Sequence, residues 1–213
     1  MTAPYKCVVV ANGSFPQTSG PLDYLHKASV IIACDGAIEA LHQAGLTPDA
    51  IVGDLDSIPA PFHHRYADRI HRVEDQEIND LTKAVRFARE AGHTEVLILG
   101  ATGLREDHTL GNISLLMDYA PMFSRVEMMS DYGLFTPLLR TTTLESRPRQ
   151  QISLFSMHPE GEISTDGLRW PILQRKLTAW WQGTLNEAQG STFTITLSAG
   201  AQVIVYRNHY PLL

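Results

Sequence analysis

Hydrophobic positions in the first part of the chain, up to about residue 130, form short runs rich in β-branched side chains. These runs predict strands at residues 6–11, 30–34, 50–53, 69–73, 96–100 and 126–130. Between them, apolar positions with helical spacing predict helices at residues 38–44, 80–91 and 108–119. In the second helix Leu81, Val85 and Ala88 share one face. Alternating strands and helices indicate βαβ units, and therefore a parallel sheet with right-handed crossovers.

The pattern changes near residue 135, where helical spacing disappears and apolar and polar positions begin to alternate. This alternation predicts strands at residues 152–157, 193–197 and 202–206. We therefore expect an α/β domain with a mostly parallel sheet at residues 1–138. A smaller antiparallel all-β domain, sandwich-like in architecture, is expected at residues 139–213.

The composition is that of an ordinary globular protein, with 44% hydrophobic and 19% charged residues in a chain of 213. The formal charge of −6 argues against a nucleic-acid partner, which would need a basic surface. The first residues lack a signal-peptide pattern, and no apolar run approaches the roughly 18 residues of a membrane span. Cys7 and Cys34 lie in apolar runs, as reduced and buried cysteines do. We therefore expect a cytoplasmic protein without a membrane partner.

Asp54 and Asp56 lie two residues apart, directly after a predicted buried strand that ends in Gly53. In open α/β sheets, ligands bind at this end of the strands. Two carboxylates about 4 Å apart repel by roughly 4 kcal/mol at an effective dielectric constant near 20, so a proton or cation is needed between them. Aspartate oxygens suit Mg²⁺, so the segment suggests Mg-nucleotide chemistry. The same residues could also form an ordinary turn.

Two other strand ends carry polar residues. Asn12 precedes Gly13 in a turn that could approach a phosphate, or that could simply use the conformational freedom of glycine. Asp35 and Gly36 follow the second strand and open a helix. Asp35 could accept a hydrogen bond from a ribose hydroxyl or a metal-bound water, or it could cap that helix.

Acidic residues crowd together before the predicted helix at residues 80–91, where Asp75, Glu77 and Asp80 fall within six positions. Asp80 and Lys83 are three residues apart and share a face of this helix. Their pairing could be an exposed ion pair at a capped helix, worth under about 1 kcal/mol. The density of acidic residues instead favours a site for a cation or a cationic substrate.

The strand at residues 96–100 leads into a loop that contains Gly100 and Gly103. Backbone N–H groups in such a loop can cradle phosphate, and Arg105 offers a forked partner for phosphate oxygens. The segment is not a P-loop, because the Gly-Lys-Ser/Thr ending is absent. Asp107 and His108 stand at the start of the next helix, where His108 could take part in chemistry or serve the structure.

Taken together, these segments resemble the thiamine pyrophosphokinase (thiamin diphosphokinase) family, in order and through most of the chain. In the first half the resemblance rests on Asp35-Gly36-Ala37, Gly53-Asp54-Leu55-Asp56-Ser57, Asp75-Gln76, Asp80-Leu81-Thr82-Lys83, and Gly100-Ala101-Thr102-Gly103 with Arg105, Asp107 and His108. In the second half it rests on Gly167-Leu168-Arg169-Trp170-Pro171 and Gly183-Thr184-Leu185-Asn186-Glu187. Each motif alone is weak, but their shared order and spacing are specific.

The resemblance implies a homodimeric enzyme with an α/β nucleotide-binding domain and an antiparallel β domain. It also implies the reaction of ATP with thiamine to give AMP and thiamine diphosphate. In that reaction the thiamine hydroxyl attacks the β-phosphorus, the whole pyrophosphoryl group moves, and AMP leaves. Positioning and charge neutralisation carry such chemistry.

The resemblance also assigns roles to residues. It implies that Mg²⁺ is held by Asp54, Asp56 and Asp80. Catalysis would involve these three together with Lys83, Arg105 and Asp107, where Lys83 and Arg105 face phosphate. ATP would be bound by Asn12, Asp35, Gly36, Gly100, Thr102, Gly103, Arg105 and His108. Thiamine would be bound by Asp80, Trp170, Thr184 and Asn186, with Trp170 stacked on the cationic thiazolium ring.

The chain departs from the family pattern at several positions. Ala37 replaces the second glycine after Asp35, Asn79 stands where threonine is usual, and Leu104 stands where glycine is common. Leu185 occupies the middle of its motif. Two alternatives remain open: another Mg-dependent phosphotransferase acting on a small alcohol, and a non-catalytic nucleotide or thiamine sensor. A sensor would be expected to lack a metal-site carboxylate, and all of these are present.

Overall fold

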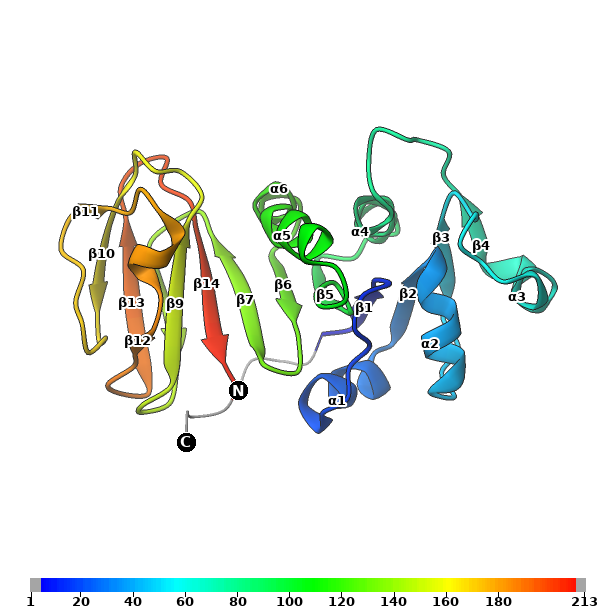
Figure 1. Cartoon of the computed structure of the whole chain (residues 1–213), viewed down its shortest axis with the longest axis horizontal. Coiled ribbons are helices and arrows are strands. Elements are labelled where there is room, and N and C mark those ends of the chain that lie inside the picture. The colour runs from blue at the N-terminus through cyan, green and yellow to red at the C-terminus, as the bar shows by residue number, and fades with distance from the viewer. Residues whose placement is uncertain (1–4, 210–213) are drawn as a thin grey trace. The chain divides into compact units, whose positions relative to one another are not determined.

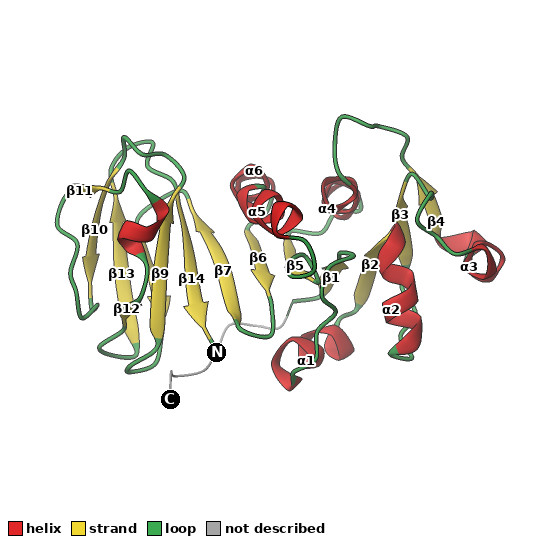
Figure 2. Ribbon diagram, in the orientation of Figure 1, coloured by secondary structure: helices red, strands yellow, loops and turns green. Residues whose placement is uncertain are grey.

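The computed structural model describes residues 5–209, which form two compact units (Figures 1 and 2). The first unit contains residues 5–115 together with 121–131, and the second contains residues 116–120 and 132–209. Strand β7 (Gly133–Leu138) belongs to the second unit, although the sequence pattern placed it before the boundary at residue 139. The two units are described separately below.

The first unit is built on a parallel sheet with the strand order β6-β5-β1-β2-β3-β4. Its strands are β1 (Cys7–Val10), β2 (Val30–Cys34), β3 (Ala50–Gly53), β4 (Ile70–Arg72), β5 (Glu95–Leu99) and β6 (Arg125–Met129). Every residue of β1 and β3 is buried, which explains why these strands appear in the sequence as continuous apolar runs. The six strands predicted in this region are confirmed, with each end within a residue of its expected position.

The helices of this region match the pattern less closely. Helices α2 (Ile38–Gln43) and α4 (Asp80–Glu90) are confirmed. The helix predicted at residues 108–119 is instead two short helices, α5 (Glu106–Ser114) and α6 (Leu116–Tyr119). Helices α1 (Ser19–Lys27) and α3 (Ala60–Arg65) were not predicted. Short 3-10 helices lie at Asp35–Ala37, Ala67–Arg69, Ala120–Met122 and Trp180–Gly183.

The second unit is an antiparallel β structure made of two groups of strands. In one group the order is β12-β9-β14-β7, with β9 (Gln151–Ser156), β12 (Asn186–Glu187) and β14 (Val203–Asn208). In the other the order is β11-β10-β13-β8, with β8 (Thr142–Glu145), β10 (Glu162–Asp166), β11 (Arg175–Lys176) and β13 (Thr192–Leu197). Leu154 and Val205 of the first group share a buried core with Ile163 and Phe193 of the second. The predicted fold class, a parallel α/β domain followed by a β-sandwich domain, is therefore confirmed.

Both cysteines are free and buried in the first unit. Burial raises the pKa of the Cys7 thiol to about 12, and Cys34 is shifted in the same direction for the same reason. Both thiols are therefore unreactive at neutral pH. Within residues 5–209, none of the helices has the length and apolar character needed to cross a membrane.

Candidate active site

A cavity of about 350 Å³ opens in the first unit where β1, β2 and β5 end. The loops that follow these strands and the start of α4 form its wall, as expected for a parallel sheet whose strands all end at one edge. Six of the predicted site residues line this cavity: Asn12, Asp35, Asp80, Gly103, Arg105 and His108. Residues far apart in the sequence therefore meet in one place.

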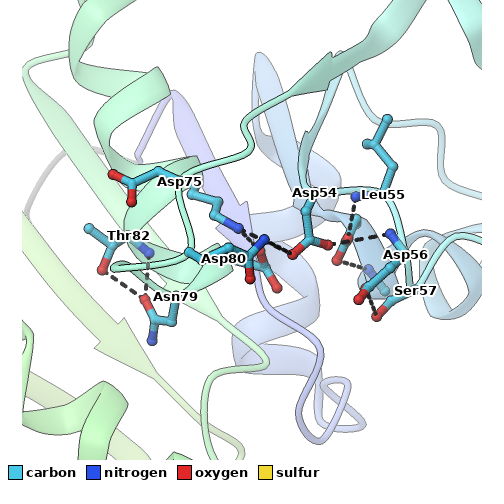
Figure 3. A network of polar contacts seen from close by, with 12 residues as sticks. Asp54, Leu55, Asp56, Ser57, Asp75, Asn79, Asp80 and Thr82 are labelled. Carbon is cyan, nitrogen blue, oxygen red and sulfur yellow. Dashed lines mark hydrogen bonds and ion pairs between the residues drawn. The ribbon is translucent and has the colours of Figure 1, made fainter.

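Three carboxylates lie close together in the first unit, and Figure 3 shows two of them, Asp54 and Asp56, with their polar contacts. Asp35, Asp54 and Asp56 each offer an oxygen, and these three oxygens all lie within 4.8 Å of one another. Asp35 begins the short helix after β2, whereas Asp54 and Asp56 follow β3. The paired strand ends thus bring together carboxylates that are about twenty residues apart in the chain. The family resemblance assigned Asp35 to the nucleotide, and its position in the sequence also allowed a hydrogen bond to a metal-bound water. Its place in the carboxylate cluster comes from the structure.

Asp35 is held firmly, and it is only 2% exposed. Its carboxylate accepts hydrogen bonds from the backbone N–H groups of Gly36, at 2.7 Å, and Leu55, at 3.1 Å. Burial raises the pKa of Asp35 above the ordinary value, and the negative charge of Asp80 adds to this effect. A bound cation would oppose both influences and favour the ionised carboxylate.

Gly53 makes room for this arrangement. A Cβ atom at position 53 would lie 2.6 Å from Cγ of Asp35, which is too close for any side chain. The Asp35 carboxylate therefore lies directly against the backbone at the end of β3, beside Asp54. This close approach gives a physical reason for the glycine that precedes the Asp-x-Asp segment.

Asp54 and Asp56 also have defined partners. Asp54 accepts hydrogen bonds from the backbone N–H of Asp56, at 3.3 Å, and from Nε2 of Gln76, at 3.2 Å. These two bonds hold the pKa of Asp54 below the ordinary value, with the backbone contribution the larger. Asp56 accepts a hydrogen bond from the Ser57 hydroxyl at 3.0 Å. Asp54 is therefore ionised at neutral pH and available as an oxygen ligand.

Lys83 lies between two carboxylates rather than in open solvent. Its Nζ is 2.9 Å from Oδ1 of Asp80 and 3.5 Å from Oδ2 of Asp54, and its side chain is 2% exposed. Burial works against the charge of Lys83, but the hydrogen bond and negative charge of Asp80, followed by the charge of Asp54, outweigh it and raise the pKa. Lys83 is therefore a buried counter-ion that ties Asp80 to the acidic cluster.

The glycine-containing loop after β5 is bound to the loop after β1. The backbone N–H of Gly13 donates to the carbonyl of Gly100 at 2.6 Å, and that of Ser14 donates to the carbonyl of Thr102 at 2.8 Å. Gly100 has φ 66°, and a Cβ at this position would lie 2.5 Å from the Ala11 carbonyl oxygen. The two loops therefore form one rigid wall of the cavity.

Arg105 and Asp107 form a forked ion pair at the start of α5. Nε and Nη2 of Arg105 donate to the two Asp107 oxygens at 3.1 and 2.5 Å. Asp107 also accepts from the backbone N–H of His108 at 2.9 Å. The Arg105 hydrogen bond is the main cause that lowers the pKa of Asp107 to about 2. Arg105 lines the cavity, so Asp107 orients a cation that faces it.

The predicted thiamine residues of the second half lie together in the second unit. Trp170, Thr184 and Asn186 line a hollow of about 240 Å³. Asn186 is buried. Its Nδ2 donates a hydrogen bond to the Trp170 carbonyl at 2.6 Å, and its Oδ1 accepts one from the Trp170 backbone N–H at 3.1 Å. The indole is 53% exposed, with the guanidinium of Arg169 4.9 Å from the ring centroid. Asn186 thus fixes the backbone that presents this aromatic face.

The structure also shows site residues that the sequence analysis did not select. Ser57, Asn79, Leu104 and Asn112 line the cavity of the first unit, and Gln76 holds Asp54. Leu104 is 75% exposed and has φ 63°. The position of Gln76 beside Asp75 in a motif could have identified it. A hydrogen bond between distant asparagines leaves no comparable signal in the sequence.

Two family models match the chain, and together they cover most of it. The model described as "Thiamin pyrophosphokinase, catalytic domain" matches residues 22–129. The model described as "Thiamin pyrophosphokinase, substrate-binding domain" matches residues 133–206.

Similar proteins carry the same family name. The chain is 31% identical to "Thiamine pyrophosphokinase 1" of Arabidopsis thaliana, in a match that covers 78% of the chain and 72% of that protein. It is 32% identical to "Thiamine pyrophosphokinase 1" of Oryza sativa subsp. japonica, in a match that covers 59% of the chain and 53% of that protein. The match thus spans about half of the rice protein. Among solved structures, that of a thiamin pyrophosphokinase from Geobacillus thermodenitrificans has the same fold, with a TM-score of 0.79, 23% identity, and coverage of 97% of this chain and 99% of that one.

Proposed function

Since the chain belongs to the thiamin pyrophosphokinase family, we propose that it transfers the pyrophosphoryl group of ATP to thiamine, giving thiamine diphosphate and AMP. The observation that carries this proposal is the convergence of three carboxylates on the edge of a cavity walled by a glycine-containing loop. A triphosphate and its counter-ion need both features.

The residues present fit Mg²⁺. Asp35, Asp54 and Asp56 offer hard oxygen ligands, and no thiol or imidazole belongs to the group they form within the described part of the chain. We propose that Asp54 and Asp56 hold the ion and that Asp35 joins them. Asp80 would act beside the ion through its bond to Lys83. Bound Mg²⁺ would supply neutralisation of the negative charge on the phosphate oxygens.

The remaining residues of the first unit would bind and orient ATP. The loop of Gly100, Thr102 and Gly103 would lie against the phosphates, and Arg105 would approach them as a forked donor. Asn12, Gly36 and His108 would complete the nucleotide site. Lys83 is buried, so we propose that it keeps Asp54 and Asp80 in place rather than binding phosphate directly.

The second unit would bind thiamine, with the exposed Trp170 face stacked on the thiazolium and with Thr184 beside the pyrimidine. The thiamine hydroxyl oxygen would bond to the β-phosphorus as the bond from that phosphorus to the α,β-bridging oxygen breaks. AMP would leave with the bridging oxygen. The hydroxyl proton would pass to His108 or Asp80, both of which line the cavity. A homodimer and a cytoplasmic location remain predictions from the sequence.

The decisive experiment incubates the purified chain with ATP, Mg²⁺ and thiamine and identifies the nucleotide product. AMP is expected, formed in step with thiamine diphosphate. ADP would indicate transfer of the terminal phosphoryl group to a small alcohol, and binding without turnover would indicate a sensor. Either result would overturn the proposal.

The acidic cluster is tested with Asp56→Asn, which removes one charge and leaves the side-chain size almost unchanged. We expect turnover to fall at least about a hundredfold, the order found when a charge-stabilising group is removed from an active site. Asp68→Asn is the matched control, since Asp68 is an exposed residue of the 67–69 turn outside the cavity. Equal activity of both variants would remove Asp56 from the site.

A further inference from the structure

Two asparagines on the cavity wall join helices α4 and α5. Nδ2 of Asn79 donates a hydrogen bond to Oδ1 of Asn112 at 3.1 Å. Asn79 directly precedes α4, and Asn112 lies on α5. Both side chains line the cavity of the first unit.

Each asparagine uses its second polar atom to hold another segment. Oδ1 of Asn79 accepts from the backbone N–H of Thr82 at 2.9 Å and from the Thr82 hydroxyl at 2.8 Å, so Asn79 also caps α4. Nδ2 of Asn112 donates to the carbonyl of Ala101 at 2.9 Å. A continuous chain of side-chain hydrogen bonds therefore runs from the start of α4 to the loop after β5.

These hydrogen bonds connect the two functional sides of the cavity. Asp80 follows Asn79 directly and is tied through Lys83 to Asp54 of the acidic cluster. Ala101 lies inside the glycine-containing loop, which is itself bonded to the loop after β1. The asparagine bridge thus links the carboxylate side of the site to the loop side.

We propose that Asn79 and Asn112 are positioning residues that set the distance between the acidic cluster and the glycine-containing loop. Mg²⁺ and the ATP phosphates must engage both sides at once, so a fixed separation lowers the cost of ordering the site when they bind. This inference rests on the proposed function for its ligand, Mg·ATP.

The capping and bridging roles of Asn79 can be separated by mutation. In Asn79→Thr the hydroxyl can still accept from the Thr82 N–H, but no amide remains to reach Asn112. Asn112→Ala removes the same bridge from the other side. Ser114→Ala is the control on α5, because its hydroxyl bonds only within that helix, to the Gly111 carbonyl at 2.7 Å.

Two quantities are measured for each variant. The first is the dissociation constant of the protein for the Mg²⁺ complex of α,β-methylene-ATP, obtained by calorimetry, and the second is the melting temperature of the protein. We expect Asn79→Thr to weaken binding about fivefold, which corresponds to one net hydrogen bond, with little change in melting temperature. In the Asn112→Ala background the same substitution should have no further effect, because the bridge is already broken. Ser114→Ala should bind as the wild type does.

Unchanged binding by Asn79→Thr would overturn the proposal. An equal effect of this substitution in both backgrounds would also do so, because it would show that the two asparagines act independently. The analogue has a methylene group in place of the α,β-bridging oxygen whose bond the proposed reaction breaks, so the result does not depend on that reaction. The wild type could bind the analogue, with binding weakened by Asn79→Thr as expected, and yet form no AMP from ATP and thiamine. In that case the proposed reaction fails and the positioning role of the two asparagines stands. A wild type that does not bind the analogue would overturn both.

Discussion

At the scale of single residues, the site relies on side chains whose roles follow from their surroundings. Lys83 and Arg105 are both cations of the motifs that carry the family resemblance, but their surroundings differ. Lys83 is buried between Asp54 and Asp80, whereas Arg105 is exposed and faces the cavity. The family resemblance implied that both cations face phosphate. Their different burial depends on how α4 packs on the sheet, which the sequence pattern does not specify.

Leu104 gives a residue-scale prediction about stability. Its φ of 63° is left-handed, a conformation that costs an L-residue about 1–2 kcal/mol, and its side chain is 75% exposed, so it contributes little packing. Leu104→Gly should therefore raise the free energy of unfolding by about 1 kcal/mol, measured by urea denaturation. Leu110→Gly, inside α5, should instead lower it by about 1 kcal/mol. A loss of stability in both variants would contradict this view of Leu104.

The Arg105–Asp107 pair gives a prediction about pH. The pKa of Asp107 in the folded protein, about 2, lies below the ordinary 3.8. The ion pair therefore contributes its full stabilisation of the fold when the pH is above the pKa of Asp107 in the unfolded chain. This contribution is lost as the pH falls through about 2. A carboxyl ¹³C NMR titration should show the midpoint of Asp107 near 2 in the wild type and closer to 3.8 in Arg105→Gln. The same midpoint in both proteins would show that Arg105 is not the cause.

At the scale of elements, burial explains why the strands of the first unit were predicted more closely than its helices. Strands of the parallel sheet are buried on both faces, so their apolar runs are continuous and their ends were predicted closely. The helices bury fewer residues: α3 buries none, and α1 buries two, as α2 does, so helical spacing is the weaker signal in this chain. The site was predictable for a related reason: parallel strands end at one edge, so polar residues that follow several of them must meet.

Helix α1 gives an element-scale prediction, because its start is held by a residue far away in the sequence. Asp131 accepts hydrogen bonds from the backbone N–H groups of Gln17 and Thr18 and from the Thr18 hydroxyl, at 2.8–3.0 Å. Asp131→Ala should lower the free energy of unfolding by about 2 kcal/mol, since these bonds go to a charged acceptor. Asp131→Asn, which keeps one acceptor oxygen, should lose less in the same urea titration. An unchanged midpoint for Asp131→Ala would show that the carboxylate does not anchor α1.

At the scale of the whole molecule, exposed apolar side chains are distributed unevenly. Among residues 5–209, the large hydrophobic side chains that are exposed in the first unit are Leu104 and Leu110. Those of the second unit are Tyr132, Leu139, Trp170, Leu173, Trp180, Trp181 and Leu185. The homodimer is a prediction from the family resemblance, and these side chains of the second unit are the ones to vary when it is tested.

The dimer is tested by measuring the mass of the chain in solution by light scattering after gel filtration. We expect about twice the 23.7 kDa of a single chain. Leu173→Ser should shift the mass toward that of the monomer, because Leu173 is 76% exposed in the second unit and its loss would remove apolar area from an interface. Leu110→Ser is the matched control, with a leucine 52% exposed in the first unit, and it should remain dimeric. A wild type of 23.7 kDa at micromolar concentration would contradict the homodimer.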